Sequence, residues 1–324
     1  MIALPVFSYV CLAGVAVLAQ LNDRRRGTLL GVTAYLIWGF AALYWVQTKP
    51  VDARDLLAHR ALWSLPFVML CLLVAGRGRL SAALALIGQP RTMGIMACAA
   101  LCGAANWIIF LWAVTHERAT EASLGYFLLP LVNVAIGLTL FRESIDGAQK
   151  WAIAFAVAAV LLQLVYHGGL PLVALGVALS FGLYGAIRKG VKVESIEGLF
   201  LETLLMAPFA IAWLVYRDGG GLGVYGASVD LFLLGAGAFT AVPLMAYVAA
   251  SRLLPLTALG LVFYIGPTAQ LLVATLAFGE PFDAVQGIAF GLVWAGLFVV
   301  TVDGFRRARQ LERLKRASDL VTQE

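Results

Sequence analysis

The hydrophobic residues of this chain fall into continuous blocks of about twenty, separated by short polar stretches. A helix of about twenty apolar residues is long enough to cross ~30 Å of hydrocarbon. The blocks do not alternate residue by residue, as the strands of an outer-membrane barrel would. The pattern therefore predicts an all-α polytopic membrane protein with ten spans, near residues 27–47, 54–75, 92–114, 119–141, 149–166, 170–187, 197–216, 229–250, 257–278 and 284–303.

Both ends of the chain lie outside this set of spans. Residues 1–21 are apolar and are followed by Arg24–Arg26, whereas a signal peptide carries its positive charge before the apolar core. The segment 1–26 is either an extra N-terminal span or upstream sequence added by a wrongly chosen start. Residues 304–324 are predicted to form a frayed, basic cytoplasmic helix, and the short apolar stretch 80–87 is predicted to lie flat at the interface.

Composition supports the membrane class and excludes others. The chain is 62% hydrophobic and 13% charged, whereas soluble domains are ~45–50% apolar. The net charge of +5 does not indicate a nucleic-acid partner, because the basic residues lie in short loops. The four cysteines lie within apolar blocks and show no metal-ligand spacing. We expect no metal and no cofactor.

The basic residues also predict an orientation. With Arg24–Arg26 in the cytoplasm and ten alternating spans, 18 of the 23 Lys and Arg residues fall on the inside and 4 on the outside, with Arg60 within a span. This bias follows the positive-inside rule. It predicts a bacterial inner-membrane protein with a cytoplasmic C-terminus.

One stretch occurs twice. Pro, Phe, Glu, Asp and Gln recur with a constant offset of 137 residues between the segments 130–149 and 267–286. Each half, 27–166 and 170–303, contains five spans, so the second must enter the membrane from the opposite face. Inverted halves of this kind are found in alternating-access transporters, whose substrate sites lie where the halves meet.

Several motifs resemble one family. The segments 35–39, 58–64, 121–127, 180–185, 198–203 and 264–268 are similar, in order and in both halves, to the RarD-type, chloramphenicol-sensitive branch of the EamA drug/metabolite transporters. The resemblance implies ten helices in two EamA repeats, an inner-membrane location and permeation of small molecules, with chloramphenicol as one candidate. Residues 1–21 depart from the family pattern.

Charged residues within spans are candidates for function because burying them is costly. Arg60 either extends its guanidinium to the interface or, with the titratable His59, faces a cavity and holds an anionic group. Glu202 is either a proton-coupling carboxylate or an interfacial acid that makes a hydrogen bond.

Uncharged polar and aromatic residues within spans form a second group, which either makes interhelical hydrogen bonds or lines a cavity. Two members, Asn133 and Gln270, are repeat mates, each three residues after its proline, and we favour cavity lining for them. The complete group is Asn106, Trp107, Tyr126, Asn133, Tyr264 and Gln270.

The repeated prolines and loops have structural interpretations as well. Pro130 and Pro267 are predicted to kink their helices, either as hinges of a site or as packing features. Glu143 and Glu280 lie at helix ends and are interpreted as structural. The capping pairs that open the fifth and tenth spans are predicted to be Asp146 with Gln149 and Asp283 with Gln286.

The leading hypothesis is a secondary transporter of small metabolites or drugs, with the lipid bilayer and a small-molecule substrate as partners. No phosphate-binding loop occurs, so a proton or substrate gradient would supply the energy. The alternatives are a channel-like or accessory membrane subunit and, less well supported, an intramembrane enzyme. Small-residue faces on the fifth and tenth spans fit either packing within one chain or a homodimer.

Overall fold

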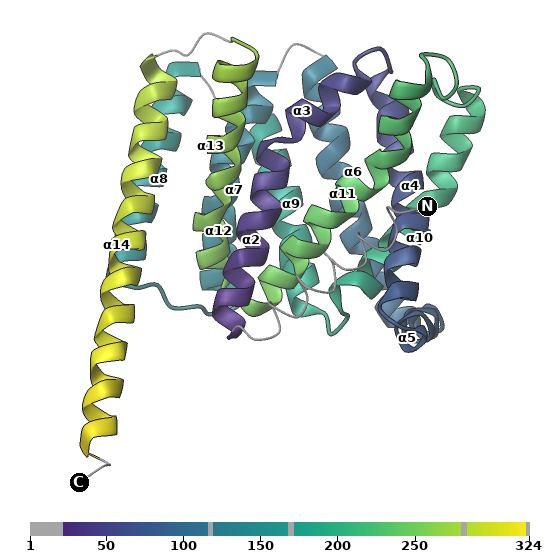
Figure 1. The fold of residues 1–324 in the computed structure, drawn as a ribbon. Coiled ribbons are helices and arrows are strands. Elements are labelled where there is room, and N and C mark those ends of the chain that lie inside the picture. Colours follow the sequence, from purple (N-terminus) through teal and green to yellow (C-terminus); the bar gives the residue numbers. More distant parts are fainter. Residues whose placement is uncertain (1–21, 116–118, 168–171, 280–283, 322–324) are drawn as a thin grey trace.

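The computed structural model describes residues 22–115, 119–167, 172–279 and 284–321, and these form a bundle of helices (Figure 1). No strand occurs within those ranges. The segment 1–21 and the predicted cap Asp283 lie outside them. The first five predicted spans correspond to α2 (Asp23–Gly39) with α3 (Ala41–Trp45) and η1 (Val46–Thr48), α4 (Ala53–Val74), α6 (Pro90–Thr115), α7 (Ala119–Thr139) and α8 (Gly147–His167).

The second five correspond to α9 (Leu172–Gly190), α10 (Ser195–Tyr216), α11 (Ala227–Leu253), the broken series α12 (Leu256–Phe263), α13 (Ile265–Leu272) and the π-helical η2 (Val273–Ala277), and α14 (Ala284–Val321). Within the described ranges, eight helices are long and apolar enough to cross a membrane, or nine if the bent pair of α2 with α3 and η1 counts as one span. On α7, the apolar stretch Gly125–Thr139 is shorter than the helices of this set. A count of ten spans remains a prediction.

Three features differ from the simple ten-span pattern. The first span bends by 42° between Gly39 and Ala41. The helix α5 (Arg77–Ile87), which covers the predicted interfacial stretch, lies across the upright helices and is seen end-on in Figure 1. The predicted helix of the tail is continuous with the last span, because α14 extends as far as Val321 (Figure 1).

Local signals explain where several helices begin. Asn22 and Asp52 accept hydrogen bonds from the backbone N–H groups of Arg25 and Arg54, at 2.9 and 2.8 Å. Such caps satisfy N–H groups that have no partner within the helix. The predicted capping pair at α8 is confirmed. Gln149 N donates to Asp146 Oδ1 at 2.8 Å, and Asp146 N donates to Gln149 Oε1 at 2.9 Å.

Proline explains the break in the ninth predicted span. The ring of Pro267 cannot donate to the carbonyl of Phe263, four residues earlier, and clashes with it. Helix α12 ends at Phe263, and α13 begins two residues later. Pro130 behaves differently, because α7 remains one helix through it.

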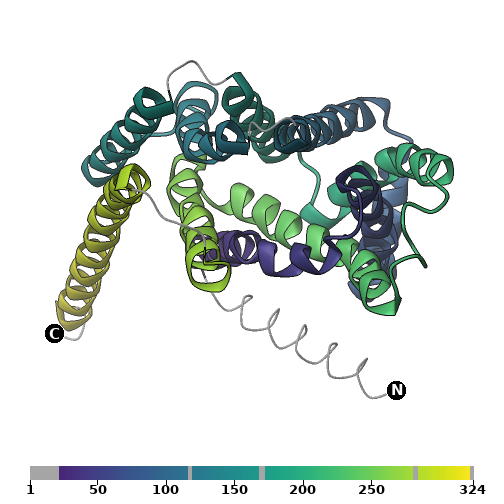
Figure 2. The same cartoon turned by 90° about the horizontal axis from the view of Figure 1, so that it is seen from above.

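The helix contacts follow a two-fold relationship between the halves. Three contacts join equivalent helices: α4 with α10, α7 with α12, and α8 with α14. Other contacts occur in matching pairs. The first span of each half packs on the third span of the other half, α2 on α11 and α9 on α6. Figure 2 shows α8 and α14 together at one side of the bundle. The contacts agree with the inverted repeat that the sequence predicts.

Candidate functional site

Arg60 on α4 is held between two indole rings. Its Cζ lies 3.1 Å from the ring centroid of Trp107 on α6 and 4.5 Å from that of Trp45 on α3. Its Nε donates to Thr240 Oγ1 on α11 at 2.9 Å. We call these four residues the Arg60 box. Tyr126 on α7 lies next to it, near enough to interact electrostatically with Arg60.

The contacts of the Arg60 box hold the guanidinium inside the bundle, between α4 and the elements that carry its partners. Arg60 is the eighth residue of α4, so its Cα lies about 10 Å along the helix from the first residue. Its partners come from three other elements, so the side chain does not extend to the interface as a snorkelling arginine would. Within the described residues, no carboxylate forms an ion pair with it.

Glu202 lies in a separate, buried cluster near the other end of the bundle. Its Oε1 lies 3.2 Å from Nε of Arg188, which is fully buried, although the geometry is not that of a hydrogen bond. Tyr184 donates its hydroxyl hydrogen to Glu202 Oε2 at 3.1 Å. The guanidinium of Arg188 also donates to the Ser195 carbonyl at 3.1 Å and to the Met96 sulfur at 3.2 Å. Glu202 is therefore one member of a buried ionic cluster in which its charge is paired with that of Arg188, while its Oε1 accepts no hydrogen bond.

Glycine makes room for this cluster. A Cβ on Gly198 would overlap the guanidinium of Arg188. The predicted span 170–187 ends one residue before Arg188, so the count of basic residues places Arg188 with the cytoplasmic loop residues Lys189 and Lys192. One signal was available: Arg188 is four residues after Tyr184, so both lie on one face of an apolar helix.

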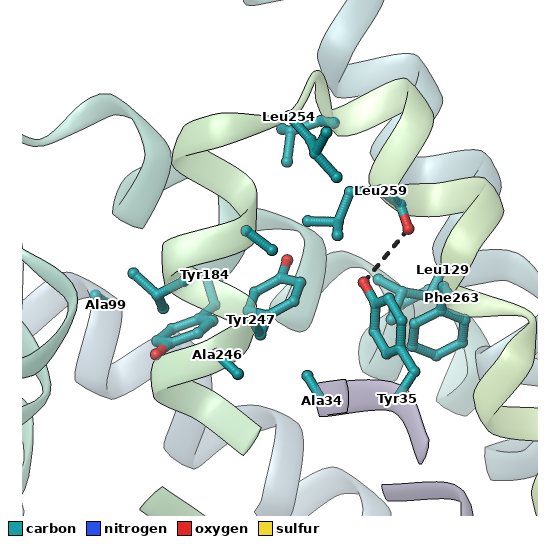
Figure 3. Close-up of a cluster of buried hydrophobic side chains, with 14 residues drawn as sticks. Ala34, Tyr35, Ala99, Leu129, Tyr184, Ala246, Tyr247, Leu254, Leu259 and Phe263 are labelled. Carbon is teal, nitrogen blue, oxygen red and sulfur yellow. Dashed lines mark hydrogen bonds between the residues drawn. The ribbon is translucent and has the colours of Figure 1, made fainter. Parts of the chain in front are cut away.

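A buried aromatic cluster contacts both halves of the bundle (Figure 3). Tyr247 on α11 is at its centre, with its ring centroid 5.1 Å from Phe181, 5.9 Å from Trp38 and 6.4 Å from Tyr184. Tyr35 donates its hydroxyl hydrogen to the Leu259 carbonyl at 3.4 Å, the dashed line in Figure 3. Because Tyr35, Tyr184 and Tyr247 are buried, this layer fills the space between α2, α9 and α11.

Beyond this layer, Glu143 joins the halves at what we call the Glu143 end, comprising residues 140–146, 188–195 and 251–257. Its carboxylate accepts from the backbone N–H groups of Leu256 and Thr257 at 2.8 and 2.9 Å. Lys189 Nζ lies 3.6 Å from Glu143 Oε1 and donates to the carbonyls of Ser251 and Leu254 at 2.9 and 2.6 Å. The structural interpretation of Glu143 stands, with contacts far from its own loop.

His59 contacts the opposite end of the bundle, which comprises residues 48–55 and 217–226. It is 1% exposed, its Nδ1 accepts from the Trp63 indole N–H at 3.2 Å, and its Nε2 lies 3.2 Å from the Gly220 carbonyl oxygen. Because Nδ1 accepts, Nε2 carries the proton and donates to Gly220. His59 thus fixes a loop, and it faces different partners from Arg60.

Ion pairs reinforce that loop. Arg217 binds Asp55 through Nε and Nη2 at 3.1 and 3.2 Å, and this hydrogen bonding raises the pKa of Arg217. Arg54 donates to the Asp52 side chain, which lowers the pKa of Asp52 against the opposing effect of its partial burial. Both pairs join or cap helix ends outside the bundle centre.

The repeat mates Asn133 and Gln270 have different surroundings. Gln270 Nε2 donates to the Trp38 carbonyl at 3.3 Å. Asn133 is fully buried, and neither its amide nitrogen nor its amide oxygen has a partner. Its side chain packs against Gly260 and lies close to Gly182.

The remaining predicted residues make interhelical contacts. Asn106 Nδ2 donates to the Val177 carbonyl at 2.7 Å, and the Tyr264 hydroxyl donates to the Phe127 carbonyl at 3.1 Å. The structure thus brings Arg60, Trp107 and Tyr126 together. It places the other predicted residues elsewhere: His59, Asn106, Asn133, Glu202, Tyr264 and Gln270. Sequence reasoning missed Trp45, Thr240, Arg188, Lys189 and Tyr247.

Comparisons with known proteins agree with this architecture. The EamA-like transporter family model matches residues 25–165 and again 170–302. RarD from Escherichia coli (strain K12) is 35% identical over 295 residues, which cover 90% of this chain and 99% of RarD. A Vibrio cholerae protein named as an uncharacterized transporter is 36% identical over 297 residues, 91% of this chain and 98% of that protein.

A Pseudomonas aeruginosa relative carries the name chloramphenicol-sensitive protein RarD and is 32% identical over 293 residues, 89% of this chain and 97% of its own. A solved crystal structure of another protein superposes with a TM-score of 0.66 at 21% identity, covering 85% of this chain and 97% of that one, and it supports the fold alone. Fold and comparisons together define a multi-pass membrane protein built from two repeats. The chain belongs to the EamA-like transporter family.

Proposed function

We propose that this protein is a secondary transporter of small molecules that works by alternating access. The observation that carries the proposal is the two-fold pattern of helix contacts between the halves. In inverted-repeat transporters, exchanging the conformations of the two halves converts one access state into the other. The transporter names of relatives over almost their whole lengths support the same class.

The polar contacts are less symmetric than the helix contacts. At the Glu143 end, Glu143 and Lys189 bind the backbone where α11 gives way to α12. The buried aromatic cluster lies between that end and the Arg60 box. We infer that this conformation is closed at the Glu143 end and that the substrate passes the Arg60 box and the aromatic cluster during transport.

We further propose a bacterial inner-membrane location with the Glu143 end and the C-terminus in the cytoplasm. The basic residues at that end support this orientation. Reporter fusions that are active only in the cytoplasm or only in the periplasm test it at residues 144, 225 and 321. Activity of the periplasmic reporter at 144 or 321 would overturn it.

The transport proposal is tested in proteoliposomes. We expect saturable uptake of a labelled compound and faster uptake when the same unlabelled compound is inside, because a carrier returns loaded. Chloramphenicol is the first probe, given the name of the Pseudomonas aeruginosa relative, followed by amino acids and small organic acids. Uptake that does not saturate and is not accelerated from the opposite side would instead indicate a channel.

The coupling ion is proposed to be the proton, with Glu202 as its candidate site. A pH gradient across proteoliposomes should then drive accumulation. In the folded, reconstituted fraction of Glu202→Gln, the effect of the gradient should disappear while counterflow persists, because counterflow needs no coupling. If the gradient acts equally on wild type and on this variant, Glu202 is not the coupling group.

A further inference from the structure

We propose that the Arg60 box is a binding site for a carboxylate, so that the transported molecules include small organic acids. The inference rests on the proposed transport function and names the substrate class for it.

Arg188 shows how this chain satisfies a buried guanidinium. It has the Glu202 carboxylate at 3.2 Å, the Ser195 carbonyl at 3.1 Å and the Met96 sulfur at 3.2 Å. Its charge is compensated by a protein carboxylate, and its terminal nitrogens donate to protein acceptors, although its Nε makes no hydrogen bond. A buried arginine in this fold therefore need not lack an anion.

Among the described side chains, Arg60 has no such set of partners. Guanidinium has five N–H donors, and the described residues accept from one of them, at Thr240. No described carboxylate pairs with Arg60. The two terminal nitrogens are also absent from the buried, unpartnered polar atoms of the described residues, so they border accessible space. A charge within a membrane bundle is costly without a counter-charge.

The contacts with the two indole rings leave the Nη1 and Nη2 edge of the guanidinium without a protein acceptor among the described residues. Trp107 and Trp45 contact Arg60 at 3.1 and 4.5 Å from their ring centroids, and such contacts involve the faces of the aromatic rings. All five N–H groups of a guanidinium lie in its plane. With Nε bound to Thr240, the Nη1 and Nη2 edge can bind both oxygens of a carboxylate in the bidentate manner that favours arginine.

The surroundings also suit the rest of such a molecule. Tyr44 stacks on Phe239 with ring centroids 4.1 Å apart, next to Trp45. Tyr126 stacks on Phe263 at 6.3 Å and lies close to Phe110. Ligand sites commonly combine an apolar, aromatic lining with a few oriented polar groups. We therefore infer a ligand with one carboxylate on a flat or apolar body.

The test measures binding separately from transport. Purified protein in lipid nanodiscs is titrated with sodium benzoate and sodium phenylacetate, and with the neutral amides of both acids, at constant ionic strength. Tryptophan fluorescence and the unfolding temperature are recorded. We expect both acids to quench fluorescence saturably and to stabilise wild type, and the amides to bind at least tenfold more weakly.

Variants assign the effect to Arg60. Arg60→Gln should weaken acid binding at least tenfold and remove the preference over the amides. Arg60→Lys should bind the acids at an intermediate affinity, because lysine is a point charge without the planar fork. Arg54→Gln is the matched control, since Arg54 is exposed and paired with Asp52, and it should bind as wild type does. If Arg60→Gln does not fold, Arg60→Lys decides the test.

Three results would overturn the inference: wild type unaffected by the acids, equal affinity for acids and amides, or unchanged acid binding by the Arg60 variants. Transport is then assayed with the same probes in proteoliposomes. Acid binding without saturable uptake would leave the site in place and refute the transporter proposal. Saturable uptake of neutral compounds, unaffected by Arg60→Gln, would support the transporter proposal and refute the carboxylate site.

Discussion

The carboxylate of Glu143, in the loop after α7, accepts a hydrogen bond from the backbone N–H of Leu256 at the start of α12, 2.8 Å away. Pro255, which occupies the cap position of that helix, makes no side-chain cap hydrogen bond. The first half of the chain thus caps a helix of the second. An anionic group at a helix N-terminus also interacts favourably with the helix dipole. Opening this end of the bundle must break the contact.

The first prediction concerns that contact. Hydrogen bonds to charged groups contribute about 1.5–3 kcal/mol each, and ~1.4 kcal/mol corresponds to a tenfold population change. Glu143→Ala should therefore expose the Glu143 end at least tenfold more often. The measurement is the rate of maleimide labelling of Ala250→Cys, a buried position on α11, in nanodiscs and in a variant lacking the native cysteines.

Ser144→Ala is the control, because Ser144 is exposed and lies in the same loop. It should label at the rate of the parent protein. Equal labelling rates for Glu143→Ala and the parent would show that the Glu143 contact does not hold this end closed.

The second prediction concerns the pair of Arg188 and Glu202. Removing one partner of a buried ion pair costs ~3–5 kcal/mol because the other charge is left uncompensated. Glu202→Gln should lower the unfolding temperature strongly, and Arg188→Met with Glu202→Leu should be less destabilised than the sum of the two single changes. Fluorescence-detected thermal unfolding in detergent measures this. Additive effects would contradict the pairing.

An exposed ion pair provides the control for that cycle. Glu194 pairs with Arg252 at 3.0 Å, but its side chain is 58% exposed. Such surface pairs contribute ~0–1 kcal/mol. Glu194→Gln should therefore leave the unfolding temperature nearly unchanged.

Local sequence patterns were sufficient for the helices and for part of their ends. Hydropathy located the spans because the bilayer fixes their length, and the pair Asp146 and Gln149 was recognisable because both capping partners lie three residues apart. The bend after Gly39 was not predicted, and the tail was predicted to be helical but not to form one helix with the last span as far as Val321. The bend has no proline within it, and the charged residues that follow the last span mark where the apolar span ends rather than where the helix ends.

The side-chain partners were harder to predict because they come from distant positions. Glu143 and Leu256 are 113 residues apart, and Arg60 and Thr240 are 180 apart. No periodicity within one helix encodes such a pair, which depends on how the halves pack. Arg188 was assigned to the loop charges because its neighbours are basic, whereas its burial depends on a glycine ten residues later, on another helix.

The third prediction uses the unequal states of Asn133 and Gln270. Gln270 binds the Trp38 carbonyl, and the repeat mate of Trp38 is Phe181, the corresponding acceptor for Asn133. Trp38-Gly39 corresponds to Phe181-Gly182 in the second half at an offset of 143 residues. We therefore expect Asn133 to bind the Phe181 carbonyl when the halves exchange conformations, at which point Gln270 loses its partner. The unpaired buried amide costs the present conformation ~1–3 kcal/mol.

Asn133→Leu, which has a similar shape without the amide, should therefore raise the unfolding temperature and slow transport by favouring one state. Gln270→Leu should lower the unfolding temperature, because it removes a formed hydrogen bond. Both are measured on the same thermal and counterflow assays. A fall in stability for Asn133→Leu, with unchanged transport, would show that its amide does not change partners.

The fourth prediction tests the glycine beneath Arg188. A methyl group on Gly198 would overlap the guanidinium, which is held by Glu202 and by two further contacts and cannot move freely. Gly198→Ala should therefore destabilise the protein by roughly 3 kcal/mol or more, as overpacking and loss of a buried network combine. Adding Arg188→Met should recover part of the loss.

Gly94→Ala, on α6 with open space around the new methyl group, is the control and should be neutral or stabilising by up to ~1 kcal/mol. If Gly198→Ala matches Gly94→Ala in thermal unfolding, the close packing of Arg188 against α10 is wrong.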